Sequence, residues 1–282
     1  MEAADIRQHR QGRQKASYLF VPGNRPERFA KACGSGAHAV IADLEDAVAP
    51  PDKPAARAAV AAGLPAAQPV YVRVNGADTE WFRDDVEMCR TAGAGIAGIM
   101  LPKAERVEDL AWIASRVGAH LPLLPLIETA QGMWHAEAIA RQPGVERLAF
   151  GSIDFQVDLG IQGDDDGRGE ELLHFRSQLV LVSRVAGIMA PVDGVTTAID
   201  DAQRLRDDAA RAHRLGFGGK LCIHPRQVEL VNACFRPSEE EADWARRVLE
   251  LAAGANGAAV AVDGKMVDKP VLLRAQAILA RL

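Results

Sequence analysis

Residues 39–44 read Ala39-Val40-Ile41-Ala42-Asp43-Leu44, an almost continuous apolar run that leads directly into two more acidic residues, Glu45 and Asp46. The run is nearly continuous in apolar residues, as expected for a parallel strand buried on both faces. Seven other short apolar runs end in polar residues in the same way: Ser17–Val21, Pro69–Val74, Gly98–Pro102, Leu123–Glu128, Arg147–Asp154, Ala190–Thr196 and Lys220–Pro225.

The segments that separate these runs are longer and predict helices. They are Arg25–Cys33, Pro54–Ala62, Thr79–Thr91, Val107–Val117, Ala130–Arg141, Glu170–Gly187, Ile199–Leu215 and Gln227–Cys234. Strands that alternate with helices predict an α/β fold with a parallel sheet, either open and doubly wound or closed. Eight repeats within roughly 235 residues favour the closed TIM-type (β/α)8 barrel.

A C-terminal extension follows the eighth repeat. Ser238 and Glu241 form a capping-box pattern at the start of a predicted helix, Ser238–Ala253, and a Gly/Ala-rich hairpin is expected over Gly254–Gly264. A last helix is expected from Lys269 to Leu282. The predicted organisation is a polar N-terminal lead at 1–15, a barrel catalytic domain at 16–236, and a C-terminal helix and lid extension at 237–282.

Composition narrows the function classes. The chain has 282 residues, 48% hydrophobic and 25% charged, with a net charge of -5, and its pI is about 5.8. Such a chain can bury a large core, and without a basic block it is not expected to bind nucleic acid. No apolar stretch is long enough for a membrane span. The four cysteines match no zinc spacing and are expected to be reduced thiols of a cytoplasmic protein.

The ends of the predicted strands carry the candidate chemistry, because barrel active sites lie where strands give way to loops. Acidic residues close the second, fifth, sixth and seventh strands, and basic residues close the first, third and fourth. Several carboxylates on one rim suit a hard cation with oxygen ligands. Arg73 and Lys103 on the same rim could hold a carboxylate or stabilise developing negative charge. Periodicity alone does not choose between the carboxylates.

Seven motifs occur in an order that resembles one known family. They are Ser17-Tyr18-Leu19-Phe20-Val21-Pro22-Gly23-Asn24-Arg25, Asp43-Leu44-Glu45-Asp46-Ala47-Val48, Arg73-Val74-Asn75, Leu101-Pro102-Lys103, Ile127-Glu128-Thr129, Gly151-Ser152-Ile153-Asp154 and Ile223-His224-Pro225. Together they resemble the HpcH/HpaI aldolase/citrate lyase family, and most closely its citrate lyase β-subunit-like branch, which includes malyl-CoA and citramalyl-CoA lyases. The resemblance extends over roughly residues 16–280.

The resemblance implies a Mg²⁺ site and a catalytic arginine. Glu128 and Asp154 would be the protein ligands of Mg²⁺, which leaves coordination positions open for water and a chelating substrate. Arg73 would bind the substrate carboxylate or thioester oxygen. Beside what the resemblance implies, Glu45, Asp46 and Lys103 are candidates for the surroundings of these groups, and at least one of Asp43, Glu45 and Asp46 could simply pair with Arg73 or Lys103.

The resemblance also implies how the acyl-CoA is bound. Phe20, Arg25 and Lys31 would hold it, and Asp268 would belong to a lid that reaches the site of a neighbouring subunit in a homotrimer. There Asp268 would act as the acid or base at the enolate carbon. We therefore expect a carbon–carbon lyase that cleaves a 3-hydroxyacyl-CoA into acetyl-CoA and a small 2-oxo acid.

Other interpretations stay open at this point. The chain could be a citrate lyase β subunit that uses an acyl carrier protein, an HpaI-type aldolase for free hydroxy-oxo acids, or a non-catalytic interaction protein. Glu128 and Asp268 could each simply cap a helix, and His224 is expected to be structural. The acidic run at 164–166 lacks the spacing of a calcium loop and is expected to be solvated.

Overall fold

The structure is a computed structural model of residues 15–65, 68–118, 121–163, 169–254, 260–262 and 265–282. Its described residues form two compact units, Lys15–Asn232 and Ala233–Leu282. Each unit has its own secondary structure and its own buried side chains.

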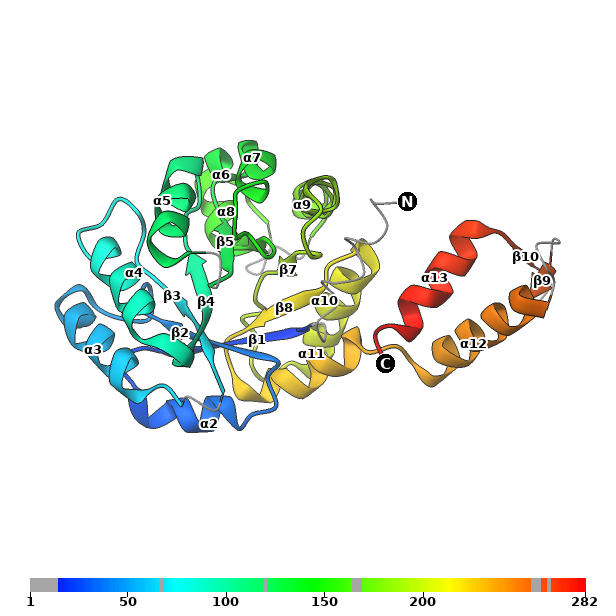
Figure 1. Cartoon of the computed structure of the whole chain (residues 1–282), viewed down its shortest axis with the longest axis horizontal. Helices are drawn as coiled ribbons and strands as arrows, with labels where there is room; N and C mark the ends of the chain where they lie inside the picture. Colours follow the sequence, from blue (N-terminus) through cyan, green and yellow to red (C-terminus); the bar gives the residue numbers. More distant parts are fainter. Residues whose placement is uncertain (1–14, 66–67, 119–120, 164–168, 255–259, 263–264) are drawn as a thin grey trace. The chain divides into compact units, whose positions relative to one another are not determined.

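The first unit is a closed barrel of eight parallel strands, as the sequence predicts (Figure 1). Each strand pairs with the next along the chain, and β8 closes the barrel by pairing with β1, with Ser17 opposite Lys220. The strands are β1 (Ser17–Pro22), β2 (Ala39–Asp43), β3 (Val70–Arg73), β4 (Ile96–Leu101), β5 (Leu123–Ile127), β6 (Ala149–Phe150), β7 (Val192–Asp193) and β8 (Gly219–Cys222).

Helices surround the barrel and connect its strands (Figure 1). They are α2 (Phe29–Cys33), α3 (Lys53–Gly63), α4 (Phe82–Thr91), α5 (Val107–Val117), α6 (Ala130–Trp134), α7 (Ala136–Ala140), α8 (Ser152–Leu159), α9 (Leu173–Ala186), α10 (Ala202–Leu215) and α11 (Val228–Phe235). The prediction of a single helix over Ala130–Arg141 is wrong in one respect. The segment forms two helices, α6 and α7, which are separated at His135, where ψ is 7°.

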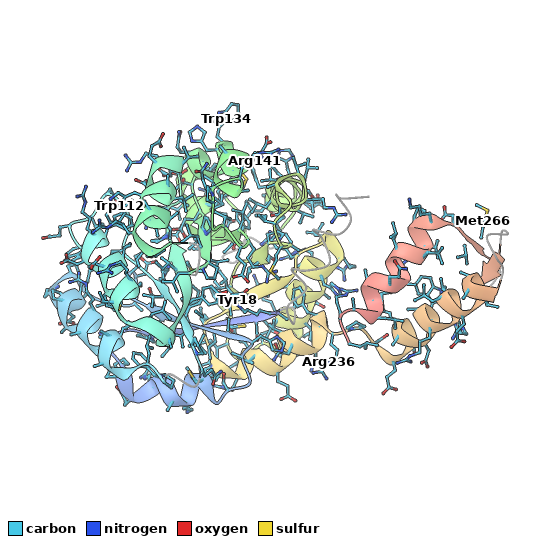
Figure 2. The ribbon with its side chains drawn as sticks, viewed as in Figure 1. Tyr18, Trp112, Trp134, Arg141, Arg236 and Met266 are labelled. Atoms are coloured by element: carbon cyan, nitrogen blue, oxygen red, sulfur yellow. The ribbon has the colours of Figure 1, made fainter. Side chains whose placement is uncertain are left out.

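Side chains of alternate strand residues fill the barrel, as the period of two along a strand requires. The interior cluster contains one or two such residues from each strand: Tyr18, Ala39, Ile41, Tyr71, Met100, Leu124, Leu126, Ala149, Val192 and Leu221. Tyr18 lies among the strands, whereas Trp134 projects from the outer surface with 84% of its area exposed (Figure 2). The barrel is therefore a packed core, and a cavity can open only at one of its ends.

The predicted sixth strand, Arg147–Asp154, is wrong at its carboxyl end. Strand β6 stops at Phe150, Gly151 is the N-cap residue, and Ser152 begins helix α8. The run 147–155 is apolar enough for either structure, so its composition did not locate the boundary. Asp154 consequently lies in the first turn of a helix rather than at the end of a strand.

The second unit contains α12 (Glu239–Gly254), β9 (Val260–Val262), β10 (Lys265–Val267) and α13 (Lys269–Leu279). The predicted capping box is confirmed, since Glu241 N–H donates to Ser238 Oγ at 3.1 Å and Ser238 N–H donates to Glu241 Oε2 at 3.0 Å. Its core is small and apolar: Ala245, Val248, Val267, Ala275 and Ile278.

The hairpin predicted at Gly254–Gly264 occurs further along the chain. Strands β9 and β10 pair antiparallel, and the second strand lies beyond the predicted range. Residues 255–259 and 263–264 of that range lie outside the described residues.

All four cysteines are free thiols, and Cys33, Cys89 and Cys222 are buried. In the described part of the chain, no helix combines the length and the apolar character that crossing a bilayer requires.

Candidate active site

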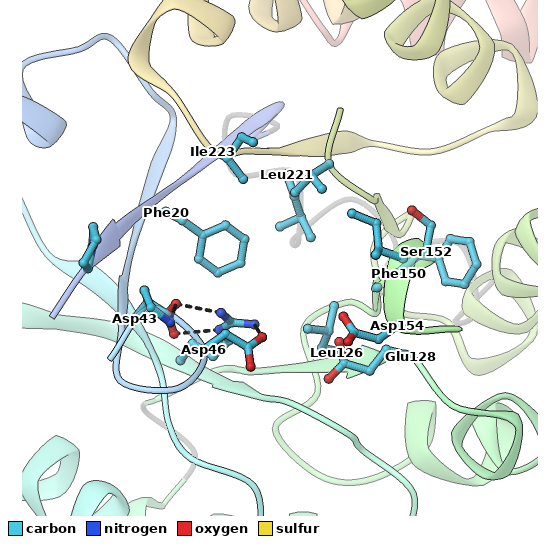
Figure 3. A pocket seen from close by; sticks show the side chains of 16 residues that line it. Phe20, Asp43, Asp46, Leu126, Glu128, Phe150, Ser152, Asp154, Leu221 and Ile223 are labelled. Atoms are coloured by element: carbon cyan, nitrogen blue, oxygen red, sulfur yellow. Dashed lines mark hydrogen bonds and ion pairs between the residues drawn. The ribbon is translucent and has the colours of Figure 1, made fainter. Parts of the chain in front are cut away.

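A cavity of about 400 Å³ opens at the carboxyl ends of the barrel strands (Figure 3). Its lining comes from six strands, from the segments that follow strands and from the first turn of α8: Phe20, Pro22, Asp43, Asp46, Ala47, Arg73, Leu126, Glu128, Phe150, Gly151, Ser152, Ile153, Asp154, Val195, Leu221 and Ile223. This is the end at which barrel enzymes carry their catalytic residues.

The cavity has an apolar floor and a charged wall, and strand geometry explains both. Phe20, Leu126 and Leu221 contact the interior cluster and line the cavity from below. Glu128 follows Leu126 by two residues and therefore lies on the same face of the chain. Arg73 likewise follows the interior residue Tyr71 by two residues. Charged side chains thus form the layer directly above the last apolar one.

Arg73 is buried and held in one orientation. Its Nε donates to Asp43 Oδ1 at 2.7 Å and its Nη2 donates to Asp43 Oδ2 at 2.6 Å, a two-pronged pair (Figure 3). The guanidinium carbon lies 4.8 Å from the centre of the Phe20 ring. Burial alone would lower the pKa of Arg73, but the carboxylates around it, Asp43 first, raise that pKa above its ordinary value. Arg73 is therefore a fixed positive charge at the cavity wall.

Glu45 and Lys103 form a second ion pair beside this arginine. Lys103 Nζ donates to Glu45 Oε1 at 2.6 Å, and Glu45 Oε2 lies 2.9 Å from Arg73 Nη1 without accepting a well-directed hydrogen bond. Burial raises the pKa of the Glu45 carboxyl despite these two cations. Asp46 reaches the same Arg73 Nη1 at 3.3 Å from a position in which 63% of its side chain is exposed.

Glu128 is buried at the end of β5, and two local features of the backbone hold it. The N–H of Lys103 donates to Glu128 Oε1 at 2.8 Å. Lys103 has a φ of 45°, and it is the one non-glycine residue of the described chain with a positive φ. Such a left-handed residue stores strain, and functional sites are where such strain is commonly found. On the opposite side lies Gly151, where an added Cβ would overlap the Glu128 carboxylate.

The environment of Glu128 disfavours a lone negative charge. Burial is the main cause and the Glu45 carboxylate the next, and together with Asp154 they raise the pKa of Glu128 to about 8. Asp154 extends from the first turn of α8 into the same side of the cavity (Figure 3). Phe155, which is fully buried, anchors this turn.

The charge balance and the donor set both fit a divalent metal ion. Five carboxyl groups, Asp43, Glu45, Asp46, Glu128 and Asp154, share the two cations Arg73 and Lys103. In the described residues no group of three or more His, Cys, Asp or Glu side chains is arranged to hold a metal. If Mg²⁺ binds here, Glu128 and Asp154 would supply two oxygen ligands, because both line the cavity, and several positions of an octahedral ion would be open for water and substrate.

The structure brings together most of the residues that the sequence singled out. Phe20, Asp46, Arg73, Glu128 and Asp154 line one cavity, and ion pairs attach Glu45 and Lys103 to it.

Arg25 and Lys31, by contrast, do not line the cavity. Both are exposed, and Arg25 Nε pairs with Glu27 Oε1 at 2.6 Å.

The helix-capping alternatives have different outcomes at Glu128 and Asp268. Thr129, not Glu128, caps helix α6, since its side chain accepts a hydrogen bond from Gly132 N–H at 3.1 Å. Asp268 does cap a helix, because its Oδ1 accepts a hydrogen bond from Val271 N–H at the start of α13. His224 caps the short helical turn Pro225–Gln227, as a structural histidine would. The acidic run 164–166 lies outside the described residues.

Some features of the site were missed from the sequence. They are the contact of Gly151 with Glu128 and the apolar surfaces of Val195 and Leu221, which depend on which strands are neighbours. The alternation of residues along each strand would have indicated Leu221, had the inward-facing register been known.

Comparison with known proteins identifies the family. Residues 16–225 match the family model described as HpcH/HpaI aldolase/citrate lyase. A citrate lyase subunit beta-like protein of Deinococcus radiodurans is 38% identical over 280 residues, which cover 94% of this chain and 96% of that protein. A (3S)-malyl-CoA thioesterase of Cereibacter sphaeroides is 38% identical over 273 residues, covering 94% of this chain and 93% of that protein.

Comparison with solved structures identifies the same family. A crystal structure of CitE from Mycobacterium tuberculosis in complex with magnesium, acetoacetate and coenzyme A superposes with a TM-score of 0.82 at 37% identity, covering 95% of this chain and 98% of that one. A citrate lyase beta subunit from M. tuberculosis, complexed with oxaloacetate and magnesium, has a TM-score of 0.70 at 34% identity and covers 80% of this chain and 99% of that one. By sequence and by fold, the chain belongs to the HpcH/HpaI aldolase/citrate lyase family.

Proposed function

We propose that this chain is a Mg²⁺-dependent carbon–carbon lyase that cleaves a 3-hydroxyacyl-CoA of the malyl-CoA or citramalyl-CoA type into acetyl-CoA and a 2-oxo acid. The observation that carries the proposal is one cavity that is lined by Arg73, whose guanidinium is held by Asp43, together with Glu128 and Asp154. The relatives whose solved structures hold magnesium with coenzyme A or with a small oxo acid support the same conclusion.

Arg73 has the role of stabilising the charge that develops when the carbon–carbon bond breaks. The bonding electrons move toward the thioester carbonyl and place negative charge on its oxygen. Because Asp43 already holds the guanidinium in place, little reorganisation is needed when that charge appears. Bound magnesium would bind and polarise the hydroxyl and carboxylate oxygens of the substrate. The apolar floor of Phe20, Leu126 and Leu221 limits water near the reacting atoms.

The proposal also assigns roles to residues that bind the acyl-CoA or belong to the second unit. Phe20, Arg25 and Lys31 are proposed to hold the acyl-CoA. Asp268 is proposed to protonate the enolate carbon from a neighbouring copy in a homotrimer, and its exposure in the second unit is compatible with such a contact. The partners of the protein would then be an acyl-CoA, a small 2-oxo acid and other copies of the chain.

A thioesterase is a second candidate, because the Cereibacter sphaeroides relatives carry the name (3S)-malyl-CoA thioesterase. The two reactions give different products from the same substrate. A lyase converts (3S)-malyl-CoA into acetyl-CoA and glyoxylate, whereas a thioesterase releases malate and free coenzyme A with its thiol.

The test is a product analysis of purified protein with (3S)-malyl-CoA and, separately, (S)-citramalyl-CoA in magnesium buffer. Acetyl-CoA together with a 2-oxo acid, and no free thiol, is the expected result. Arg73→Lys should slow it at least about tenfold, since one ammonium cannot replace a two-pronged guanidinium. Arg90→Lys, which changes an exposed arginine paired with Glu87, is the matched control and should leave the rate unaltered.

Free thiol with malate would favour the thioesterase. No turnover of either thioester would favour a citrate lyase β subunit that depends on an acyl carrier protein, or an aldolase for free acids.

A further inference from the structure

Asp43 covers one edge of the Arg73 guanidinium. Asp43 occupies its Nε and Nη2 at 2.7 and 2.6 Å, and Asp43 is itself fixed because it accepts hydrogen bonds from the N–H groups of Glu45 and Ala47. A substrate that approaches from the cavity can therefore reach Nη1, but not the side of the guanidinium that Asp43 covers.

Two carboxylates already lie near this nitrogen, and they differ in how they are held. Glu45 is 8% exposed, and Lys103 fixes its other oxygen at 2.6 Å. Asp46 is the opposite case. Its side chain is 63% exposed, it lines the cavity, and its Oδ2 accepts a 3.3 Å hydrogen bond from Arg73 Nη1. Glu45 is thus a permanent neighbour of Arg73, whereas Asp46 can rotate into solvent at little cost.

We infer that Asp46 occupies, in the free protein, the position on Arg73 Nη1 that an anionic oxygen of the ligand takes, and that it leaves when the ligand binds. The inference deepens the proposed function and rests on it. A long, half-solvated ion pair of this kind contributes little stability, so a ligand can replace it. Asp46 therefore competes with an anionic ligand for Arg73 Nη1, and this competition weakens the binding of the ligand.

The competition has a consequence for selectivity. A ligand must offer Nη1 a better acceptor than the Asp46 carboxylate does. An ionised carboxylate or a developing enolate meets that condition more easily than a neutral carbonyl oxygen, because charge-assisted hydrogen bonds are the stronger class. The residue therefore favours ligands with negative charge at this point of the cavity.

Equilibrium binding of acetoacetate, measured by calorimetry in magnesium buffer, tests the inference. Asp46→Asn keeps the size of the side chain but removes its charge, so Arg73 Nη1 becomes available. The dissociation constant should fall about two- to fivefold, the range that corresponds to one exposed ion pair. The matched control is Asp52→Asn, which removes an equal charge from an exposed residue that does not line the cavity, and it should leave binding unchanged.

The outcomes separate this inference from the proposed function. If the wild type binds acetoacetate and Asp46→Asn binds it equally or more weakly, Asp46 is not a competitor and the inference is wrong. If Asp52→Asn tightens binding as much as Asp46→Asn, the effect is general electrostatics and the inference is wrong as well. If the wild type binds no acetoacetate with magnesium present, the proposed function fails and the inference fails with it.

Discussion

Magnesium binding at Glu128 should depend steeply on pH. Burial and the neighbouring carboxylates raise the pKa of Glu128 to about 8, well above its ordinary value of 4.5. The metal ion requires the ionised carboxylate, so binding must displace the proton that the free protein still holds at neutral pH. Affinity should therefore rise with pH and level off once the carboxyl ionises by itself.

The size of the effect follows from the same pKa. With a pKa of about 8, only about a tenth of the free protein carries ionised Glu128 at pH ~7, and about a hundredth does at pH ~6. The apparent affinity for Mg²⁺ should then increase roughly tenfold per pH unit between these values, and roughly a hundredfold between pH ~6 and pH ~9.

The stability of the metal-free protein should show the opposite slope. The unfolded chain loses its Glu128 proton near 4.5, while the folded chain keeps it to about 8. Because the folded state holds more protons in this window, its free energy of unfolding should fall as pH rises through it. Magnesium should restore the stability most strongly at the alkaline end of the window.

Calorimetry of Mg²⁺ binding in two buffers of different ionisation enthalpy measures both the affinity and the protons released. About one proton per metal ion is expected near pH ~7. Glu128→Gln serves as the control, because it should bind weakly and lose the pH dependence. An affinity that stays constant between pH ~6 and pH ~9, or binding without proton release, would refute this account of Glu128.

Three further experiments test the local geometry around Lys103, Gly151 and Tyr71. In urea denaturation, the free energy of unfolding of Lys103→Gly should exceed that of Lys103→Ala by about 1 kcal/mol. Both variants lack the ammonium group, and only alanine is strained at a φ of 45°. Equal free energies of unfolding would contradict backbone strain at this position. Gly151→Ala should weaken Mg²⁺ binding at least about tenfold by displacing Glu128, whereas Gly34→Ala, at an exposed glycine with a φ of -76°, should not. Tyr71→Phe removes a hydroxyl that bonds Lys15 and Glu146 below the cavity, so it should lower the free energy of unfolding by about 1–3 kcal/mol with kcat unchanged; a large loss of kcat would show that the two ends of the barrel are coupled.

The sequence was sufficient for the architecture because the strands are short, apolar and regularly spaced. It located five of the strands to within a residue or two. The predicted eighth strand ended three residues too late, and β6 and β7, which are two residues each, are much shorter than predicted. The apolar residues Ile153 and Phe155 follow the end of the strand, so hydrophobicity does not show where β6 gives way to α8. The boundary depends on Gly151, whose close contact with Glu128 is a tertiary feature.

The candidate site was less predictable from pattern alone. The predicted strand ends supplied the charged residues that line or adjoin the cavity, and only the resemblance to a known family selected Glu128 and Asp154 among the carboxylates as metal ligands, a role that stays a prediction. The pairing of Arg73 with Asp43 was one of several possibilities in the sequence, and the barrel register decides it by placing these two residues opposite each other. The roles of Arg25, Lys31 and Asp268 remain predictions, because they concern contacts beyond the cavity.

The most direct test of the central claim is the release of a 2-oxo acid from (3S)-malyl-CoA and (S)-citramalyl-CoA by three proteins: the wild type, Glu128→Gln, and Glu137→Gln as an exposed matched control. Release by the wild type should stop in a chelator and return with added Mg²⁺. Glu128→Gln should lose at least about a hundredfold in rate, because it removes one of the two proposed protein ligands of the metal, while Glu137→Gln should match the wild type. Release that continues in the chelator, or that survives in Glu128→Gln, would contradict a magnesium-dependent lyase at this cavity.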